Sequence, residues 1–97
     1  MTKLIYPIVF VFNKDTSQYN GYIPDLSIVS EGVTLQEALS EAKELAKNYF
    51  ILAKKYAIKP EKPSSKEVTA SKWPGYEIST IEIEWQGEGA PEPKEFG

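Results

Sequence analysis

The side chains that could do chemistry in this chain are limited, because it contains neither histidine nor cysteine. The commonest general acid–base group, the commonest metal ligand and the thiolate nucleophile are therefore missing. Metal-dependent hydrolysis of a nucleic acid would have to use several carboxylates that converge on a pair of ions. The candidates are Asp25, near one predicted strand end, and Glu82 and Glu84, two residues apart on the last predicted strand.

These carboxylates do not fit such a site. Glu82 and Glu84 share a strand face that the alternating pattern predicts to be exposed, and the first predicted strand carries no acidic residue. The chain also lacks a glycine-rich phosphate loop, a serine elbow and any metal-ligand spacing. We therefore expect a protein that is not an enzyme and that uses no metal and no cofactor.

Composition and charge favour a single globular domain and disfavour a nucleic-acid binder. The chain has 97 residues, 41% of them apolar and 26% charged, which is typical of one globular domain. The net charge is −3, without the basic patch of a nucleic-acid binder, so we expect no direct contact with DNA or RNA from this chain alone. The acidic surface has two interpretations: it attracts a basic protein partner, or it only keeps the protein in solution.

The sequence also predicts where the domain lies and in which compartment it works. No run of about 18 apolar residues is present, so no membrane-spanning helix is expected. The absence of a secretory signal and of cysteine favours a cytoplasmic protein. Residues 1–85 carry the predicted strands and helix and form the predicted domain. Residues 86–97, rich in glycine, proline and glutamate, are predicted to be a disordered acidic tail.

The first half of the chain predicts three strands. Residues 4–12 are β-branched and aromatic and are apolar on both faces of the predicted strand. Such a strand is either central or covered by a neighbouring subunit, so we predict a homo-oligomer, a dimer or a tetramer. Pro7 cannot donate to a ladder and places the early part of this strand at an edge or a bulge. Residues 19–23 and 26–30 are predicted as the second and third strands.

A long amphipathic helix follows. Thr34 and Glu37 form a capping box, and the residue before Pro60 is where the helix is expected to end. Phe50 falls at the margin of the apolar stripe and Ile51 on the outward side. The predicted buried stripe consists of Leu35, Ala38, Leu39, Ala42, Leu45, Ala46, Tyr49, Leu52, Ala53 and Tyr56.

The last third of the chain predicts a loop and one more strand. Residues 60–75 are rich in proline, serine and lysine and are predicted as a loop, with at most a short strand near Val68. In residues 76–85, apolar positions alternate with Glu82 and Glu84, and a change of phase predicts a bulge near residues 79–80. The expected fold is α+β: a small, mainly antiparallel sheet with one long helix packed on a face, in the order ββ(β)αβ.

Three stretches resemble the HicB-like antitoxin family. The opening IYPIVFVF and YNGYIPDL resemble its hairpin and its Pro-Asp-Leu signature, EGVTLQEALSEAKELAKNY resembles its helix entry, and IKPEKPSS resembles its proline-serine exit. Together they cover roughly residues 4–65. The matching signature residues also have structural roles in turns and caps, and we interpret them as structural: Pro24, Asp25, Leu26, Gly32, Thr34, Glu37 and Ala38.

The resemblance implies a partial ribonuclease-H-like fold and a function as an antitoxin. The partner would be a small, basic HicA-like toxin that cleaves RNA and is neutralised when its active site is blocked. Many family members also carry a C-terminal DNA-binding module, whereas only twelve residues follow Trp85 here. Glu82, Glu84 and Trp85 are the candidate partner contacts. The alternative is a stand-alone HicB-like oligomeric module that regulates or binds a ligand without a toxin partner.

Overall fold

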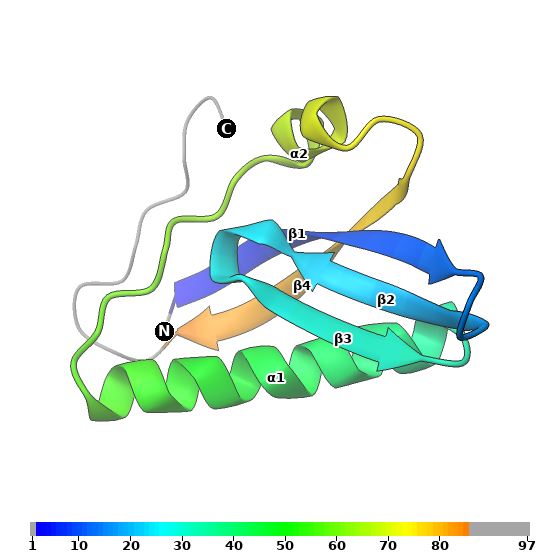
Figure 1. The fold of residues 1–97 in the computed structure, drawn as a ribbon. Helices are drawn as coiled ribbons and strands as arrows, with labels where there is room; N and C mark the ends of the chain where they lie inside the picture. Colours follow the sequence, from blue (N-terminus) through cyan, green and yellow to red (C-terminus); the bar gives the residue numbers. More distant parts are fainter. Residues whose placement is uncertain (1, 86–97) are drawn as a thin grey trace.

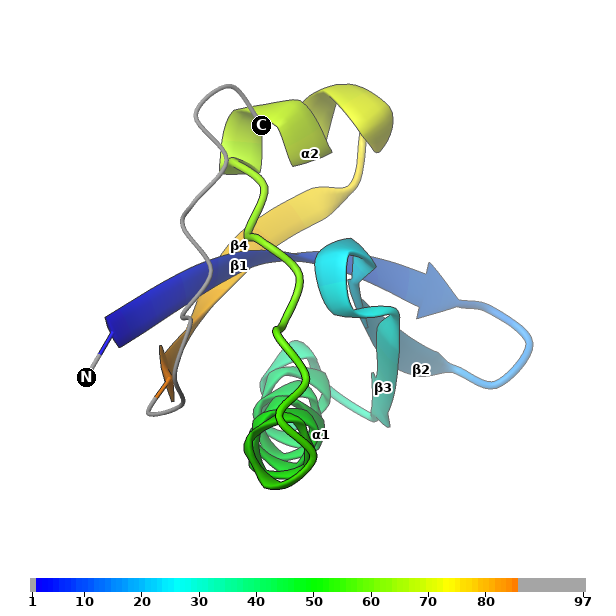
Figure 2. The ribbon, with the colours of Figure 1, turned by 90° about the vertical axis from the view of Figure 1, so that its left-hand side faces the viewer.

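The computed structural model describes residues 2–85 of the protein, with the side chains of residues 3–84. They form a four-stranded antiparallel sheet in the order β3-β2-β1-β4, with one helix on each face (Figures 1 and 2). The predicted α+β fold with one long helix on the sheet is confirmed. The elements are β1 (Thr2–Asn13), β2 (Gln18–Ile23), the 3-10 turn η1 (Pro24–Leu26), β3 (Ile28–Gly32), α1 (Leu35–Lys55), α2 (Lys66–Lys72) and β4 (Glu77–Trp85).

The middle of the central strand β1, residues 6–10, is buried on both faces. Alternate residues of a strand point to opposite faces, and the main core lies on the face that α1 covers. The strand residues of that core are Leu4, Tyr6, Ile8 and Phe10 of β1, Ile23 of β2, and Ile81 and Ile83 of β4. On the other face, Pro7 and Val9 are also completely buried. The two-sided apolar pattern of residues 4–12 therefore reflects a central strand.

The second face is covered by the chain itself. The segment that follows α1 crosses to the other side of the sheet and leads into α2 (Figure 2). The Trp73 ring, at the end of α2, contacts the Tyr22 ring with their centroids 5.5 Å apart. Pro60 and Pro63 of the crossing segment are buried as well. One copy thus covers Pro7 and Val9, whereas Ile5 on the same face is 52% exposed, and the predicted homo-oligomer stays a prediction.

The prediction of a loop over residues 60–75 is wrong in one part, because residues 66–72 form α2. The Ser65 hydroxyl accepts a hydrogen bond from the Val68 N–H at 3.1 Å and caps the helix. No strand forms near Val68; its N–H belongs to the first turn of α2.

Helix α1 begins where it was predicted and ends earlier. Its last residue is Lys55, four residues before the predicted end at Lys59, and Ala57, with a left-handed φ of 54°, turns the chain toward the crossing segment. Phe50 is only 5% exposed and belongs to the core, not to the margin, whereas Leu52 and Tyr56 are exposed. Ile51 is exposed, as predicted. The buried centre of the helix is the row Ala38, Ala42, Ala46, Phe50 and Ala53.

The strand register is continuous, so the predicted bulge near residues 79–80 is wrong. Pairing of β1 with β4 runs from Thr2 opposite Trp85 to Phe10 opposite Glu77 without a break. Ile78 lies opposite Val9 and packs on the second face, which explains its change of phase. At Gly21 the register is also continuous, and a Cβ there would lie 2.7 Å from the Ser30 hydroxyl oxygen. Gly21 therefore permits a close approach of the Ser30 side chain.

Among residues 2–85, no helix has the length and apolar character that crossing a bilayer requires.

Candidate protein-binding groove

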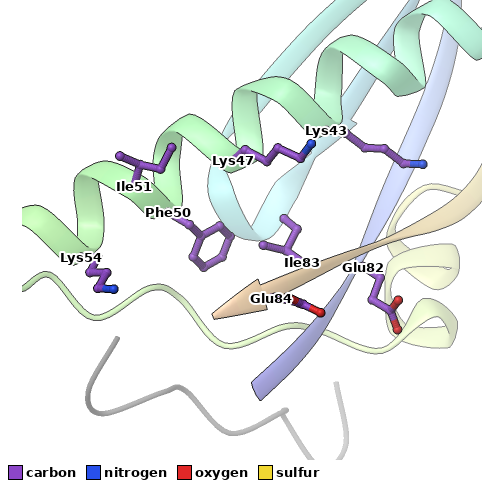
Figure 3. A pocket seen from close by; sticks show the side chains of 8 residues that line it. All are labelled: Lys43, Lys47, Phe50, Ile51, Lys54, Glu82, Ile83 and Glu84. Carbon is purple, nitrogen blue, oxygen red and sulfur yellow. The ribbon is translucent and has the colours of Figure 1, made fainter. Parts of the chain in front are cut away.

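An open groove of about 610 Å³ lies between α1 and the edge strand β4 (Figure 3). The helix crosses the sheet obliquely (Figure 1), and the groove lies between one flank of α1 and the C-terminal part of β4. The residues around it are Lys43, Lys47, Phe50, Ile51 and Lys54 of α1, with Glu82, Ile83 and Glu84 of β4.

The helix side of the groove is cationic. Lys43, Lys47 and Lys54 are spaced by four and seven residues, which places them on one flank of α1. All are exposed. The only ion pair among the described residues joins Lys47 to Glu44 at 3.8 Å, with both side chains well exposed, and such pairs contribute little to stability. The lysine charges therefore stay open to an incoming partner.

The strand side of the groove is acidic. Residues directly opposite in an antiparallel pair share a face, so Glu82, opposite Ile5, and Glu84, opposite Lys3, point away from α1. Ile81 and Ile83 point toward α1 and are buried, as their alternation predicted. Both glutamates are exposed. The edge of β4 thus separates an acidic sheet face from a lysine-rich helix flank.

Apolar groups line the groove between these charges. Phe50 and Ile83 present the small exposed parts of their core side chains, and Ile51 beside them is 63% exposed. Buried apolar anchors surrounded by charged groups are the usual composition of a protein interface. The arrangement can bind a protein segment.

The backbone of β4 at this edge is also open. Pro7 has no N–H and cannot exchange two hydrogen bonds with Thr80, which lies opposite it. Because bonded and non-bonded pairs alternate in an antiparallel ladder, the β4 residues that turn their N–H and C=O groups away from β1 are Ile78, Thr80, Glu82 and Glu84. No side chain of residues 3–84 hydrogen-bonds to these groups.

The opposite edge of the sheet, β3, is partly protected: of the outward N–H groups of Val29, Glu31 and Val33, the last two donate to carboxylates of α1. By the same alternation, Glu31 turns its N–H outward, and that N–H donates to the Glu41 carboxylate of α1 at 3.2 Å. The next outward N–H, of Val33, donates to the Glu37 carboxylate at 2.9 Å. Strand β3 is also only five residues long, and short or covered edges resist pairing with other chains. The two edges of the sheet therefore differ in their availability.

The Pro-Asp-Leu residues make a structural joint far from the groove. Pro24–Leu26 form η1, and Leu26 is buried. The Asp25 carboxylate accepts two hydrogen bonds, from the Ser64 N–H and hydroxyl, both at 2.7 Å. Asp25 thereby fixes the crossing segment just before α2, a contact between residues 39 positions apart that no local pattern could reveal.

The remaining signature residues form the junction between β3 and α1. The Thr34 hydroxyl accepts a hydrogen bond from the Glu37 N–H at 3.1 Å, and a Cβ on Gly32 would collide with the Glu37 and Ala38 backbone. Ala38 is completely buried, and its carbonyl accepts a bond from the Ser30 hydroxyl at 2.7 Å. These contacts agree with the structural interpretation.

Tyr6, a core residue of β1, hydrogen-bonds to the crossing segment. Its hydroxyl donates to the Glu61 carbonyl at 2.7 Å, and its side chain has no exposed surface. Burial, aided by the neighbouring Tyr49, Asp25 and Glu61, raises the pKa of the Tyr6 hydroxyl well above its ordinary value. Tyr6 therefore acts as a neutral donor that helps to position the segment.

The structure brings together two of the three candidate partner contacts. Glu82 and Glu84 both line the groove. Trp85 ends β4 opposite Thr2, and its side chain lies outside the described part of the chain, as does the predicted disordered tail of residues 86–97. The sequence interpretation did not include the lysines of α1 in a candidate site. Their placement on a single flank was the available signal.

The carboxylates considered for metal-dependent hydrolysis do not form a site. Asp25 is engaged with Ser64, while Glu82 and Glu84 lie exposed on β4. Over residues 2–85, no group of three or more acidic side chains could hold a metal ion.

Comparison of the chain with protein-family models and with curated proteins gave no match. The resemblance to HicB-like antitoxins therefore rests on the residues quoted for it.

Proposed function

We propose that this protein is an antitoxin-type inhibitor that binds and neutralises a small, basic, HicA-like RNA-cleaving protein. The observation that carries the proposal is the groove between α1 and β4, which combines apolar anchors, exposed charges of both signs and an unpaired strand edge. The resemblance of residues 4–65 to HicB-like antitoxins supports the choice of partner.

The charges suggest how inhibition would work. A protein that cleaves RNA must attract phosphate groups, so its active-site surface carries lysine or arginine. Glu82 and Glu84 offer carboxylates to the same surface, while Ile51 and Ile83 give the contact apolar area. Exposed charges of this kind mainly speed association, and the buried apolar contacts slow dissociation. The bound antitoxin then blocks the toxin by occupying the surface that RNA would use.

Co-expression tests the proposal. The chain is produced with any small basic protein encoded beside it, followed by size-exclusion chromatography and an RNA-cleavage assay. We expect co-elution and loss of cleavage. Separate elution with undiminished cleavage would reject inhibition of that neighbour.

A second candidate function follows from the size of the groove. Small-molecule sites typically measure about 300–1,000 Å³, and the volume of about 610 Å³ falls in that range. A stand-alone regulatory module that binds a charged small molecule, with or without self-association, would use the same lysines. A stable oligomer measured by light scattering, together with the failure of any encoded neighbour to co-elute, would favour this function over the first.

A further inference from the structure

We propose that the protein partner binds by adding an extended strand to the open edge of β4. This inference rests on the proposed function that the chain binds a protein, and it assigns the mode of binding and the chemistry of the bound segment. The added strand would carry acidic and apolar side chains on the face toward α1, and basic side chains on the opposite face.

The outer edge of β4 has backbone groups that are free to bond to another strand. Ile78, Thr80, Glu82 and Glu84 direct N–H and C=O groups away from β1, and no side chain of the described residues bonds to them. An extended peptide that adds to such an edge satisfies these groups in one regular ladder. The other edge, at β3, is short, and the Glu41 carboxylate already bonds to the Glu31 N–H. Strand addition is therefore directed to β4.

The charges on the two sides of β4 define the added strand. Its side chains on one face would enter the groove between Ile83 and the flank of α1 that bears Lys43, Lys47 and Lys54 (Figure 3). Its side chains on the other face would lie beside Glu82 and Glu84. Because side chains alternate along a strand, a segment with acidic and basic residues at alternate positions matches both faces at once.

The same charges disfavour a second copy of this chain at the edge. A two-fold pairing of β4 with β4 would place the α1 lysines of both copies on one face of the joined sheet. It would place Glu82 and Glu84 of both copies on the other face. Like charges that face each other across a strand pair are destabilising. A different chain of alternating charge avoids both sets of like-charge contacts, the lysines on one face and the glutamates on the other.

A peptide pair tests the chemistry of the segment. The probe is a fluorescent-labelled peptide, Glu-Lys-Val-Lys-Glu-Lys-Val-Thr, which places Glu and Val on one strand face and Lys on the other. Its control has the same composition, with charges of both signs on each face. By fluorescence anisotropy at low salt, we expect the probe to bind the full chain at least tenfold more tightly. Lys43→Glu with Lys47→Glu should abolish that preference. Equal binding of the two peptides would overturn the proposal.

A proline variant tests the mode of binding. Thr80→Pro removes one outward N–H while leaving the hydrogen bonds between β1 and β4 in place, because Thr80 lies opposite Pro7 in a pair without them. Thr80→Val is the matched control, since it keeps the N–H. We expect at least tenfold weaker probe binding for Thr80→Pro and no change for Thr80→Val. Equal affinity of the two variants would overturn strand addition.

Amide exchange measured by NMR on the unaltered chain gives a readout that does not depend on how a proline variant folds. With the probe bound, protection should increase at Ile78, Thr80, Glu82 and Glu84, while Ser79, Ile81 and Ile83 are protected already. Increased protection elsewhere, and not at β4, would contradict the proposal.

Strand addition and the proposed function can fail separately. If a toxin is inhibited by the wild-type chain and equally by the Thr80→Pro variant, strand addition fails and the proposed function stands. If the probe binds as expected and no neighbour is inhibited, the proposed function fails and strand addition stands.

Discussion

At the scale of single residues, two partly buried polar contacts help to determine where the crossing segment lies. The Tyr6 hydroxyl donates to the Glu61 carbonyl, and Asp25 accepts both hydrogen bonds from Ser64. Each contact joins residues far apart in the sequence, so the sequence patterns that predicted turns and caps could not predict them. They hold the segment that leads to α2 and covers the second face of the sheet.

Tyr6→Phe should have a pH-dependent effect on stability. At neutral pH the loss of one hydrogen bond should lower the free energy of unfolding by about 1 kcal/mol. Burial raises the pKa of Tyr6 in the folded chain, so as the pH rises above about 10 the unfolded chain loses this proton first. Stability then falls by up to about 1.4 kcal/mol per pH unit, and Tyr6→Phe removes this contribution. Urea unfolding at pH 8, 10 and 11 measures both effects. If the free energy of unfolding fell with pH equally steeply in the variant and the wild type, the explanation would be contradicted.

Asp25→Ala and Ser64→Ala should be coupled. Asp25→Ala removes a charged acceptor of two bonds and should lower the free energy of unfolding by about 2–3 kcal/mol. Ser64→Ala keeps the backbone N–H and should lower the free energy of unfolding by about 1 kcal/mol. In the double variant the two losses should fall short of additivity by at least about 0.5 kcal/mol, measured by chemical denaturation. Additive losses would show that the two residues act independently.

At the scale of elements, local signals explain what the sequence predicted well. Thr34 and Glu37 form their cap within one helical turn, so the start of α1 was predicted correctly. The end of α1 depends on Ala57 adopting a left-handed conformation, which its residue type does not favour. Helix α2 was missed because it has only seven residues between proline-rich stretches. Phe50 was misplaced because the buried row of α1 is centred on its alanines, not on its leucines.

Gly32→Ala should strongly weaken the junction between β3 and α1. The added Cβ would meet the backbone of Glu37 and Ala38, which the first turn of α1 holds in place. Overpacking against backbone should lower the free energy of unfolding by roughly 1–3 kcal/mol. Gly75→Ala is a useful comparison, because nothing lies within 4 Å of its Cβ position and only its φ of 85° opposes a side chain. Thermal unfolding of both variants measures the difference; equal losses would contradict the steric explanation.

At the scale of the whole molecule, the sequence predicted part of the candidate site. The alternation around Glu82 and Glu84 indicated an exposed acidic strand, and both residues line the groove. The opposing lysines of α1 belong to the site only because the helix crosses the sheet obliquely, leaving a gap beside β4. The crossing angle depends on packing between Ala38, Ala42 and the sheet, which one-dimensional periodicity does not report. For the same reason, the sequence did not predict which sheet edge is open.

We propose that the acidic edge of β4 binds and inhibits a basic RNA-cleaving partner. An RNA-cleavage assay of any small basic protein encoded beside this chain, titrated with the wild-type chain and with the Glu82→Lys, Glu84→Lys double variant, tests this directly. Glu67→Lys, an exposed charge reversal on α2, is the control. We predict that the double variant needs at least tenfold more protein for half-inhibition and that the control behaves as wild type. Equal inhibition by all three proteins would contradict the account.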